Sequence, residues 1–374
     1  MNNNCVVDSS AQQRFLLLDG LRGIAALMVL GYHLFEAIAF AANAPEQHMF
    51  HGFLAVDFFF ILSGFVMGYA YDKRWNSMTI GQFIRLRLIR LHPMVIMGII
   101  IGILAFYLQG CVNWEGNIIP SPTIFLCIIM SLILLPALGG TDVRGNTELY
   151  PLNGPHWSLF FEYIGNLLYA LLLHRLKDRW LGLWIVISAI ALALMGLTAE
   201  TGSLGYGWSS EPTNMLGGFL RLSISYPMGL WLWRKYKLLS PCTLPSWTAL
   251  PCTLAIIILL SIPSFHHSTT NIFFQLACII VAFPVIIWTG ALTITSAKMN
   301  KAYSILGQLS YPLYATHYPL IYLYIHWINI GWNPFDTYTY LMPVTLACFA
   351  ILIGWVCSRF YDIPVRNWLK KHIH

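Results

Sequence analysis

The chain has 374 residues, of which 57% are hydrophobic and 10% are charged, and its mean hydropathy is +0.65. This composition excludes an ordinary water-soluble protein and is typical of a polytopic membrane protein. The formal charge of +6 is spread along the chain, so it informs orientation in the membrane and does not indicate a nucleic-acid partner.

The chain opens on a polar stretch, MNNNCVVDSSAQQR, that lacks the basic and apolar regions of a signal peptide. We therefore expect a cytoplasmic N-terminal tail at 1–14, a transmembrane domain at 15–360 and a cytoplasmic C-terminal tail at 361–374. The eight cysteines include no CxxC pair, and the paired histidines have no Cys, Asp or Glu nearby at a ligand spacing. We expect no metal site.

A spanning helix needs about 20 mostly apolar residues, and eleven segments qualify as candidates. They are 15–40, 52–72, 93–108, 122–138, 156–174, 181–199, 214–233, 247–262, 271–291, 311–328 and 339–359. If all of them crossed, the basic segment HRLKDR (174–179) would lie outside, which the positive-inside rule penalises. The segment 122–138 is short and bounded by SPT and PALGG, so we expect it to lie on the outer face or to re-enter it. The sequence predicts an all-α polytopic fold with about ten spans and both termini in the cytoplasm.

Ionisable side chains inside spans cost roughly 2.5–3.5 kcal/mol each on insertion scales, so they are candidates for function. Here they are Arg22, His33, Glu36, Asp57, Glu162, Arg221 and His317. At about 1.5 Å per residue, His33 lies about 16 Å along its helix from Arg22. Asp57 and Glu162 follow the outer ends of their expected spans, so we expect both carboxylates at a depth similar to His33. Hydrogen bonds between helices would explain any one of these groups, but three at one depth favour a site.

Five motifs in chain order carry a family resemblance. They are LDGLRGIAALMVLGYH, GFLAVDFFFILSGFVMGY, FIRLRLIRLHP, WSLFFEYIGNLLY and LGQLSYPLYATHYPL. Together they resemble the acyltransferase-3 family of integral-membrane acyltransferases, many of which O-acetylate bacterial surface polysaccharides. The resemblance runs from about Asp19 to the final span.

The resemblance implies a ten-span enzyme of the bacterial inner membrane. Such an enzyme takes an acetyl group from cytoplasmic acetyl-CoA and delivers it to a hydroxyl of a glycan or lipid-linked saccharide outside. The family's Arg-x10-His pattern falls on Arg22 and His33, with His33 as the catalytic residue, and its Arg-x-x-Arg pattern falls on Arg87 and Arg90. The family commonly has two acidic residues after WSL, whereas only Glu162 stands here. Some members also carry a C-terminal hydrolase-like domain, so we expect this chain to act alone or with a separate protein.

An imidazole that removes the proton of an attacking hydroxyl contributes typically about 10² to 10⁴ in rate, and His33 suits this role. A carboxylate on the other ring nitrogen would orient the ring. Asp57 is the first expected partner and Glu162 the second. An acyl-imidazole on His33 is the alternative mechanism, and the sequence does not separate the two.

Guanidinium groups are well suited to bind the phosphates of coenzyme A, because they form bidentate hydrogen bonds with phosphate oxygens. Arg87 and Arg90 lie one helical turn apart, and we expect them to bind these phosphates, although an interfacial helix bound to lipid phosphates would also explain RLRLIR. Arg22 is expected where the pantetheine arm enters, with snorkelling to lipid headgroups as its alternative. His317 is expected to line the donor path, with a structural role equally open.

The runner-up function is a transporter for a glycan or small molecule, since intramembrane Arg, His and Asp also serve transport. Transporters often show inverted repeats with breaks in corresponding halves, and none is visible here. A lipid, peptide or small-molecule acceptor is a third alternative. The sequence leaves open the acceptor, the length of the acyl chain and the oligomeric state.

Overall fold

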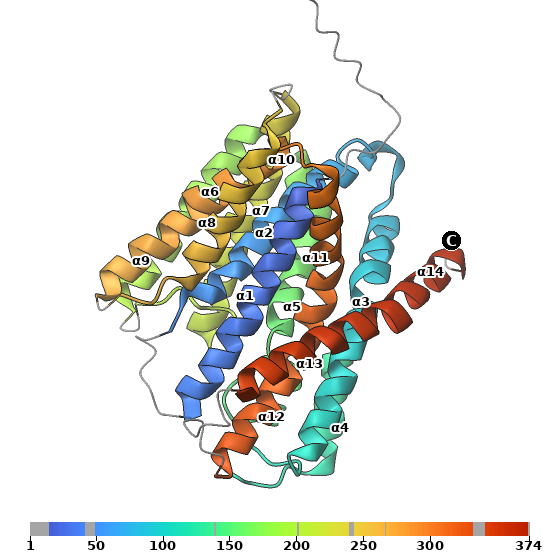
Figure 1. The fold of residues 1–374 in the computed structure, drawn as a ribbon, viewed down its shortest axis with the longest axis vertical. Helices are drawn as coiled ribbons and strands as arrows, with labels where there is room; N and C mark the ends of the chain where they lie inside the picture. The colour runs from blue at the N-terminus through green and yellow to red at the C-terminus, as the bar shows by residue number, and fades with distance from the viewer. Residues whose placement is uncertain are drawn as a thin grey trace, which may run out of the picture.

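The computed structural model describes residues 15–41, 49–137, 140–199, 202–238, 243–265, 267–331 and 341–372. Within these ranges the chain is helical, with isolated bridges and no strand, which confirms the all-α prediction. Most of the helices stand side by side in one bundle (Figure 1). Their bounds are α1 Leu16–Ala41, α2 Ala55–Tyr71, α3 Ile80–Leu108, α4 Ser121–Leu132, α5 His156–Leu171, α6 Asp178–Thr198, α7 Pro212–Leu238, α8 Ala249–Ser261, α9 Ser268–Ala277, α10 Phe283–Leu292, α11 Ala297–Thr316, α12 Tyr318–Asn329, α13 Leu341–Cys357 and α14 Ile363–His372.

Six helical segments of the described ranges are long and apolar enough to cross a membrane. They are Leu16–Phe40, His51–Tyr71, Ile80–Leu108, Asp178–Thr198, Ser268–Leu292 and Leu341–His372. These segments fit a multi-pass membrane protein. The helix α4 has 12 residues and measures about 18 Å, well short of the ~30 Å hydrocarbon core. The ten spans and the cytoplasmic termini stay predictions.

The bundle is organised by close crossings between helices far apart in the sequence. The helix α1 packs along α11, and α2 packs along α7. At the second crossing Gly64 and Gly229 remove the side chains that would keep the two backbones apart. A Cβ on Gly64 would overlap the carbonyl of Tyr226, and one on Gly229 would overlap that of Ile61. Small residues allow this approach where lipid gives apolar side chains no reason to associate.

The helix α3 begins thirteen residues before the expected start at 93, so that boundary was wrong. Thr79 caps the helix by accepting from the backbone N–H of Gln82, whose side chain accepts from the N–H of Thr79. This capping box starts the helix ahead of the arginines. Arg87 and Arg90 therefore belong to the same continuous helix as the apolar span.

The expected span at 311–328 is divided by a break at His317 between α11 and α12. Pro319 has no N–H and its ring excludes the carbonyl four residues earlier, so the carbonyl of Ala315 loses its helical partner. The Asn153 side chain donates to that carbonyl at 2.8 Å. The break is thus held open by a side chain from the loop before α5, and it leaves His317 at the joint.

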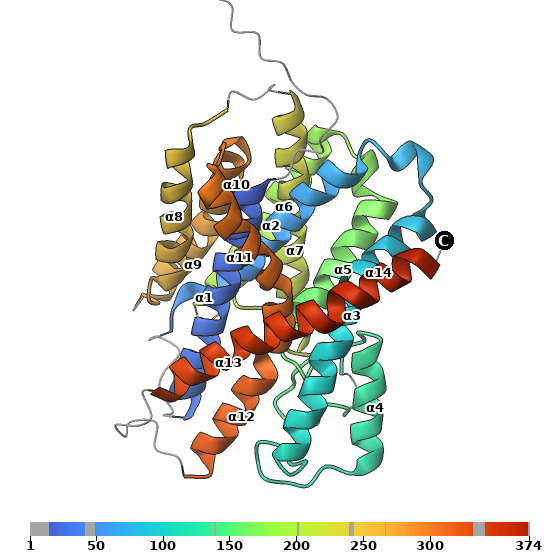
Figure 2. The same cartoon turned by 45° about the vertical axis from the view of Figure 1, so that its right-hand side comes forward.

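The helix α13, the π-helical turn Ser358–Asp362 and α14 form a long rod that runs obliquely across one side of the bundle (Figure 2). The rod crosses α11, where the backbone of Gly354 lies against Leu313. Its far end packs against α3. Residues that the sequence assigned to a C-terminal tail therefore continue as helix along the membrane domain.

Candidate active site

A cavity of about 550 Å³ lies between α1, α2, α3, α5, α11 and the C-terminal rod. Its wall carries four guanidinium groups, from Arg22, Arg87, Arg90 and Arg366. It also carries three carboxylates, from Asp19, Glu162 and Asp362. We call this space the basic cavity. Its volume lies within the range of small-molecule sites, and its charge favours an anionic ligand.

Three of the four arginines face a carboxylate. The closest nitrogen–oxygen distances are 3.6 Å for Arg22–Asp19, 3.1 Å for Arg87–Glu162 and 2.7 Å for Arg366–Asp362. Arg90 is exposed, and the described part of the chain gives it no hydrogen bond or ion pair. The cavity therefore presents at least one guanidinium whose donors are not used by the protein.

Glu162 lies in the wall of the basic cavity, away from His33. Its Oε1 accepts from the Ser63 hydroxyl at 3.0 Å and from Nη2 of Arg87 at 3.1 Å. The expectation that Glu162 could orient the His33 ring was therefore wrong. The structure gives this carboxylate a different contact, since it fixes the guanidinium of Arg87 against α5.

His33 lies beyond the basic cavity, in the second half of α1. Its Nδ1 is 2.7 Å from Oε2 of Glu36, one turn further along the helix. Because a carboxylate only accepts, Nδ1 carries the proton and Nε2 is the basic nitrogen of the neutral ring. Sequence reasoning recognised Glu36 as an intramembrane charge but gave it no role, although a spacing of three residues on one helix already predicts contact.

The ring of His33 stacks on the ring of His317, with centroids 5.5 Å apart and planes inclined by 29°. The Tyr318 ring stands edge-on to His33 at 4.7 Å. Nδ1 of His317 donates to the carbonyls of Leu313 and Tyr314, both at 3.0 Å, so its Nε2 carries the lone pair. Nε2 is buried and has no hydrogen-bond partner in the described ranges. His33 and His317, the imidazole pair, thus present two basic nitrogens at the break between α11 and α12.

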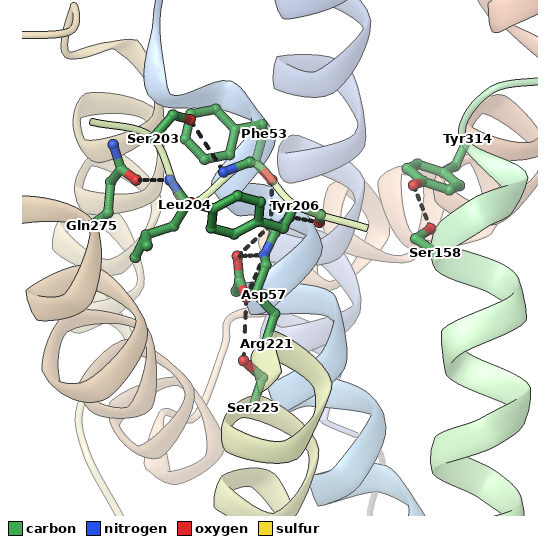
Figure 3. Close-up of polar contacts among 11 residues, drawn as sticks. Phe53, Asp57, Ser158, Ser203, Leu204, Tyr206, Arg221, Ser225, Gln275 and Tyr314 are labelled. Atoms are coloured by element: carbon green, nitrogen blue, oxygen red, sulfur yellow. Dashed lines mark hydrogen bonds and ion pairs between the residues drawn. The ribbon is translucent and has the colours of Figure 1, made fainter. Parts of the chain in front are cut away.

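Ser158 and Tyr314 separate the basic cavity from the imidazole pair. Both residues line the cavity, and their hydroxyls are 2.5 Å apart (Figure 3). The Tyr314 ring lies 6.0 Å from the ring of His317. Sequence reasoning missed this pair because nothing local links the two residues, which are 156 positions apart. Through the bundle, the arginines are therefore followed in space by the hydroxyl pair and then by the imidazole pair.

Asp57 forms a buried ion pair with Arg221 and does not contact His33, so its assignment as the first partner of His33 was wrong. Nη2 of Arg221 is 2.6 Å from Oδ2 of Asp57, and its Nε lies 3.2 Å from both carboxylate oxygens (Figure 3). The same guanidinium donates to the backbone carbonyls of Tyr206 and Phe53. A buried arginine needs a carboxylate to offset its lost hydration, and Asp57 supplies it.

The predicted site residues thus fall into three surroundings. Arg22, Arg87, Arg90 and Glu162 line the basic cavity. His33 and His317 form the imidazole pair beyond it, and Asp57 lies in a separate ion pair. The expected cluster of His33, Asp57 and Glu162 does not form.

Comparison with known proteins supports the family resemblance. The sequence model of a protein family described as "Acyltransferase domain" matches residues 15–363. "Protein 2 in picA locus" of Rhizobium radiobacter is 32% identical over 194 residues, which cover 50% of this chain and 96% of that protein. "O-acetyltransferase OatA" of Staphylococcus aureus is 24% identical over 372 residues, covering 94% of this chain and 57% of OatA. "Acyltransferase MdmB" of Streptomyces mycarofaciens is 31% identical over 192 residues, 48% of this chain and 44% of that protein.

The chain spans little more than half the length of the OatA relative it matches. No solved structure matches the chain. The family match covers nearly the whole membrane domain, including the imidazole pair and every residue that lines the basic cavity except Arg366. On this match, the chain belongs to the acyltransferase-3 family of membrane-bound acyltransferases.

Proposed function

We propose that this chain transfers an acetyl or other short acyl group from acyl-CoA to a hydroxyl of a cell-surface glycan or its lipid-linked precursor. The observation that carries the proposal is the order of groups along the bundle. Arginines line a cavity that Ser158 and Tyr314 also line, the ring of Tyr314 lies next to His317, and His317 stacks on His33. A donor with phosphates at one end and a thioester at the other fits this order.

The arginines are suited to the phosphates of the donor. A guanidinium forms bidentate hydrogen bonds with phosphate oxygens, and Arg90 has all its donors available among the described contacts. Arg87 is held in place by Glu162, and Arg22 donates to the carbonyl of Gly307 at 3.2 Å. In this proposal Arg87 and Arg90 bind phosphate, while Arg22 lies along the pantetheine arm. His317 lies where the thioester would arrive.

His33 acts as the general base in this proposal. Its Nε2 takes the proton from the acceptor hydroxyl as that oxygen attacks the thioester carbonyl. The carbon–sulfur bond then breaks, and the CoA thiolate takes up the proton from the imidazolium. Glu36 keeps the ring in the required tautomer and stabilises the imidazolium, a role that the sequence had assigned to Asp57.

Charge suggests how the protein is oriented. The four arginines of the basic cavity come from the first halves of α1 and α3 and from α14, so they lie toward the end of the bundle where α1 and α3 begin. The positive-inside rule assigns such an end to the cytoplasm, where acyl-CoA is available. We therefore propose a bacterial inner-membrane protein with both termini in the cytoplasm and the imidazole pair toward the outer half of the bilayer.

The test is transfer of label from acetyl-CoA to glycan in membranes that contain the His33→Ala variant. We expect transfer to fall about 10²- to 10⁴-fold, while membrane insertion and thermal unfolding stay as in the wild type. His326→Ala is the matched control, because His326 lies on α12 and does not line the basic cavity. Undiminished transfer by His33→Ala would refute the mechanism.

The same assay separates the alternatives. Movement of glycan across the membrane without any transfer of label would favour a transporter. Label trapped on the wild-type protein in the absence of acceptor, and lost in His33→Ala, would favour an acyl-imidazole intermediate over a general base.

A further inference from the structure

We infer that the C-terminal rod is part of the donor site: Arg366 binds a phosphate of the CoA donor, and Asp362 positions its guanidinium. This inference rests on the proposed function. It adds a phosphate-binding residue from the segment after the last expected span, which the sequence assigned to a tail.

Two charged residues of the rod, Asp362 and Arg366, line the basic cavity, whereas Arg359, Lys370 and Lys371 are exposed. Ser358, Asp362, Ile363 and Arg366 line the basic cavity. Phe360 and Trp368, in contrast, are 70% and 58% exposed. The inward side is therefore fitted to the cavity, and the outward side suits the apolar boundary of a membrane.

The π-helical turn Ser358–Asp362 sets this orientation. A π turn adds a residue to the helical repeat and so rotates everything that follows it, and such turns are frequent at functional sites. Asp362 and Arg366 are four residues apart and share one face of the rod. Both side chains thereby line the wall of the same cavity as Arg90, which comes from α3.

The Asp362–Arg366 pair has hydrogen-bonding capacity that the protein does not use. The side chain of Asp362 is only 2% exposed, yet its Oδ1 has no partner within the described ranges. Nη2 of Arg366 is 2.7 Å from Oδ2 of Asp362, whereas its buried Nε has no partner there. Because Oδ1 only accepts, it cannot pair with a phosphate, and the donors left for phosphate oxygens are those of the Arg366 guanidinium.

The chemistry of the pair fits one end of the donor. Asp362 holds one edge of the guanidinium, and the side chain of Arg366 remains 30% exposed toward the cavity. Arg90, on α3, lines the same cavity, so phosphate oxygens bound there have guanidinium groups from both α3 and the C-terminal rod available as donors. Arg366 is a binding residue in this proposal, and Asp362 is a positioning residue.

The experiment measures equilibrium binding of radiolabelled CoA to the purified full-length protein in nanodiscs, without acceptor. We expect Arg366→Ala to weaken CoA binding about tenfold or more, as Arg90→Ala should, because each removes charge-assisted hydrogen bonds. Arg366→Lys keeps the charge and loses the planar fork, so its binding should be intermediate. Arg359→Ala is the matched control, since Arg359 lies in the same π turn, is exposed and does not line the cavity.

A second measurement assigns the effect to the phosphates. With S-acetyl-pantetheine as donor, which has no phosphoadenosine end, the transfer kcat/KM of Arg366→Ala should equal that of the wild type. Asp362→Asn should lower the affinity for CoA and likewise leave the pantetheine donor unaffected. Equal losses with both donors would mean general damage to the fold and would overturn the inference.

The outcomes distinguish this inference from the function on which it rests. If wild-type protein failed to bind CoA at all, the proposed function would fail. If the wild type bound CoA, Arg90→Ala weakened binding and Arg366→Ala bound as tightly as the wild type, only the role of the C-terminal rod would be lost.

Discussion

Two arginine–carboxylate pairs in the bundle, Arg221–Asp57 and Arg87–Glu162, differ in what their surroundings leave unused. The side chains of Arg221 and Asp57 are 1% and 0% exposed, and every nitrogen of Arg221 has a partner. Those of Arg87 and Glu162 are 4% and 20% exposed, line the basic cavity, and leave Nε of Arg87 without a partner in the described ranges. Both pairs bring charge into a membrane domain, but only the second retains capacity to bind anything else.

The comparison refines the rule that an intramembrane charge marks a functional site. The rule identifies residues whose burial needs an explanation, and for Asp57 and Arg221 the explanation is each other. Function is better indicated by charges that remain partly unsatisfied next to a cavity. By that criterion the basic cavity and the imidazole pair qualify, whereas the Asp57–Arg221 pair is a brace between α2 and α7.

The largest effect should follow from breaking the fully buried Asp57–Arg221 pair. Asp57→Asn leaves the charge of Arg221 buried without a counter-ion, and we expect the folded state to lose about 3–5 kcal/mol. The measurement is the thermal unfolding and the monodisperse yield of the purified protein. Glu162→Gln is the matched control, because Arg87 faces the cavity and should tolerate the loss with little destabilisation. A stable Asp57→Asn protein that lacked transferase activity would return Asp57 to the chemistry.

The sequence was informative wherever a structural decision is local. The apolar run at 15–40 matches α1, and the expected span at 156–174 matches α5, since hydropathy and length decide where a helix can cross. The arginines of the Arg-x10-His and Arg-x-x-Arg patterns lie in one cavity, and their expected roles in binding CoA stay predictions. The break at His317 could also have been predicted from the sequence, because Pro319 disrupts the helix that the hydropathy indicates.

The partners of the charged residues could not be predicted in the same way. Asp57 and Arg221 are 164 positions apart, and hydropathy does not report which helices become neighbours. The same limit hid the Ser158–Tyr314 pair and the contribution of Arg366. Glu36 is the exception, since its position three residues after His33 predicts their contact from helical geometry alone.

A smaller effect should follow from altering the partly exposed His33–Glu36 pair. Glu36→Gln keeps a hydrogen-bond acceptor for Nδ1 but removes the negative charge that stabilises the imidazolium. We expect kcat to fall about tenfold or more, less than for a fully buried triad carboxylate, because the Glu36 side chain is 35% exposed and water screens it.

Affinity for CoA and thermal unfolding should both stay unchanged in Glu36→Gln, which separates a positioning role from a structural one. Glu211→Gln serves as the control, since Glu211 is exposed and precedes α7 outside the site. Normal kcat in Glu36→Gln would show that His33 needs no carboxylate and would weaken its assignment as the base.

The smallest effect concerns Glu148. This carboxylate is buried in a third kind of environment, in which the described contacts include no ion pair. It lies in the loop before α5, accepts from the Tyr322 hydroxyl, and has Asp142 and Arg144 as charged neighbours. Burial raises the pKa of Glu148 to about 7 from its usual 4.5, and the charge of Arg144 opposes this rise. The folded protein therefore holds a proton that the unfolded chain releases between these two pH values, so stability falls as the pH rises from about 5 to 7.

Glu148→Gln cannot ionise, so its thermal midpoint should exceed that of the wild type by a few degrees at pH 8, and the two should converge near pH 5. Identical pH profiles would mean that Glu148 is ionised throughout and offset by Arg144, which stacks on the Tyr322 ring at 3.8 Å. Glu148 would then resemble Asp57, because the charge of its carboxylate would be neutralised by an arginine inside the protein. A profile that converges at low pH would instead show that a carboxylate can be accommodated in this bundle by holding its proton, without an arginine to match it.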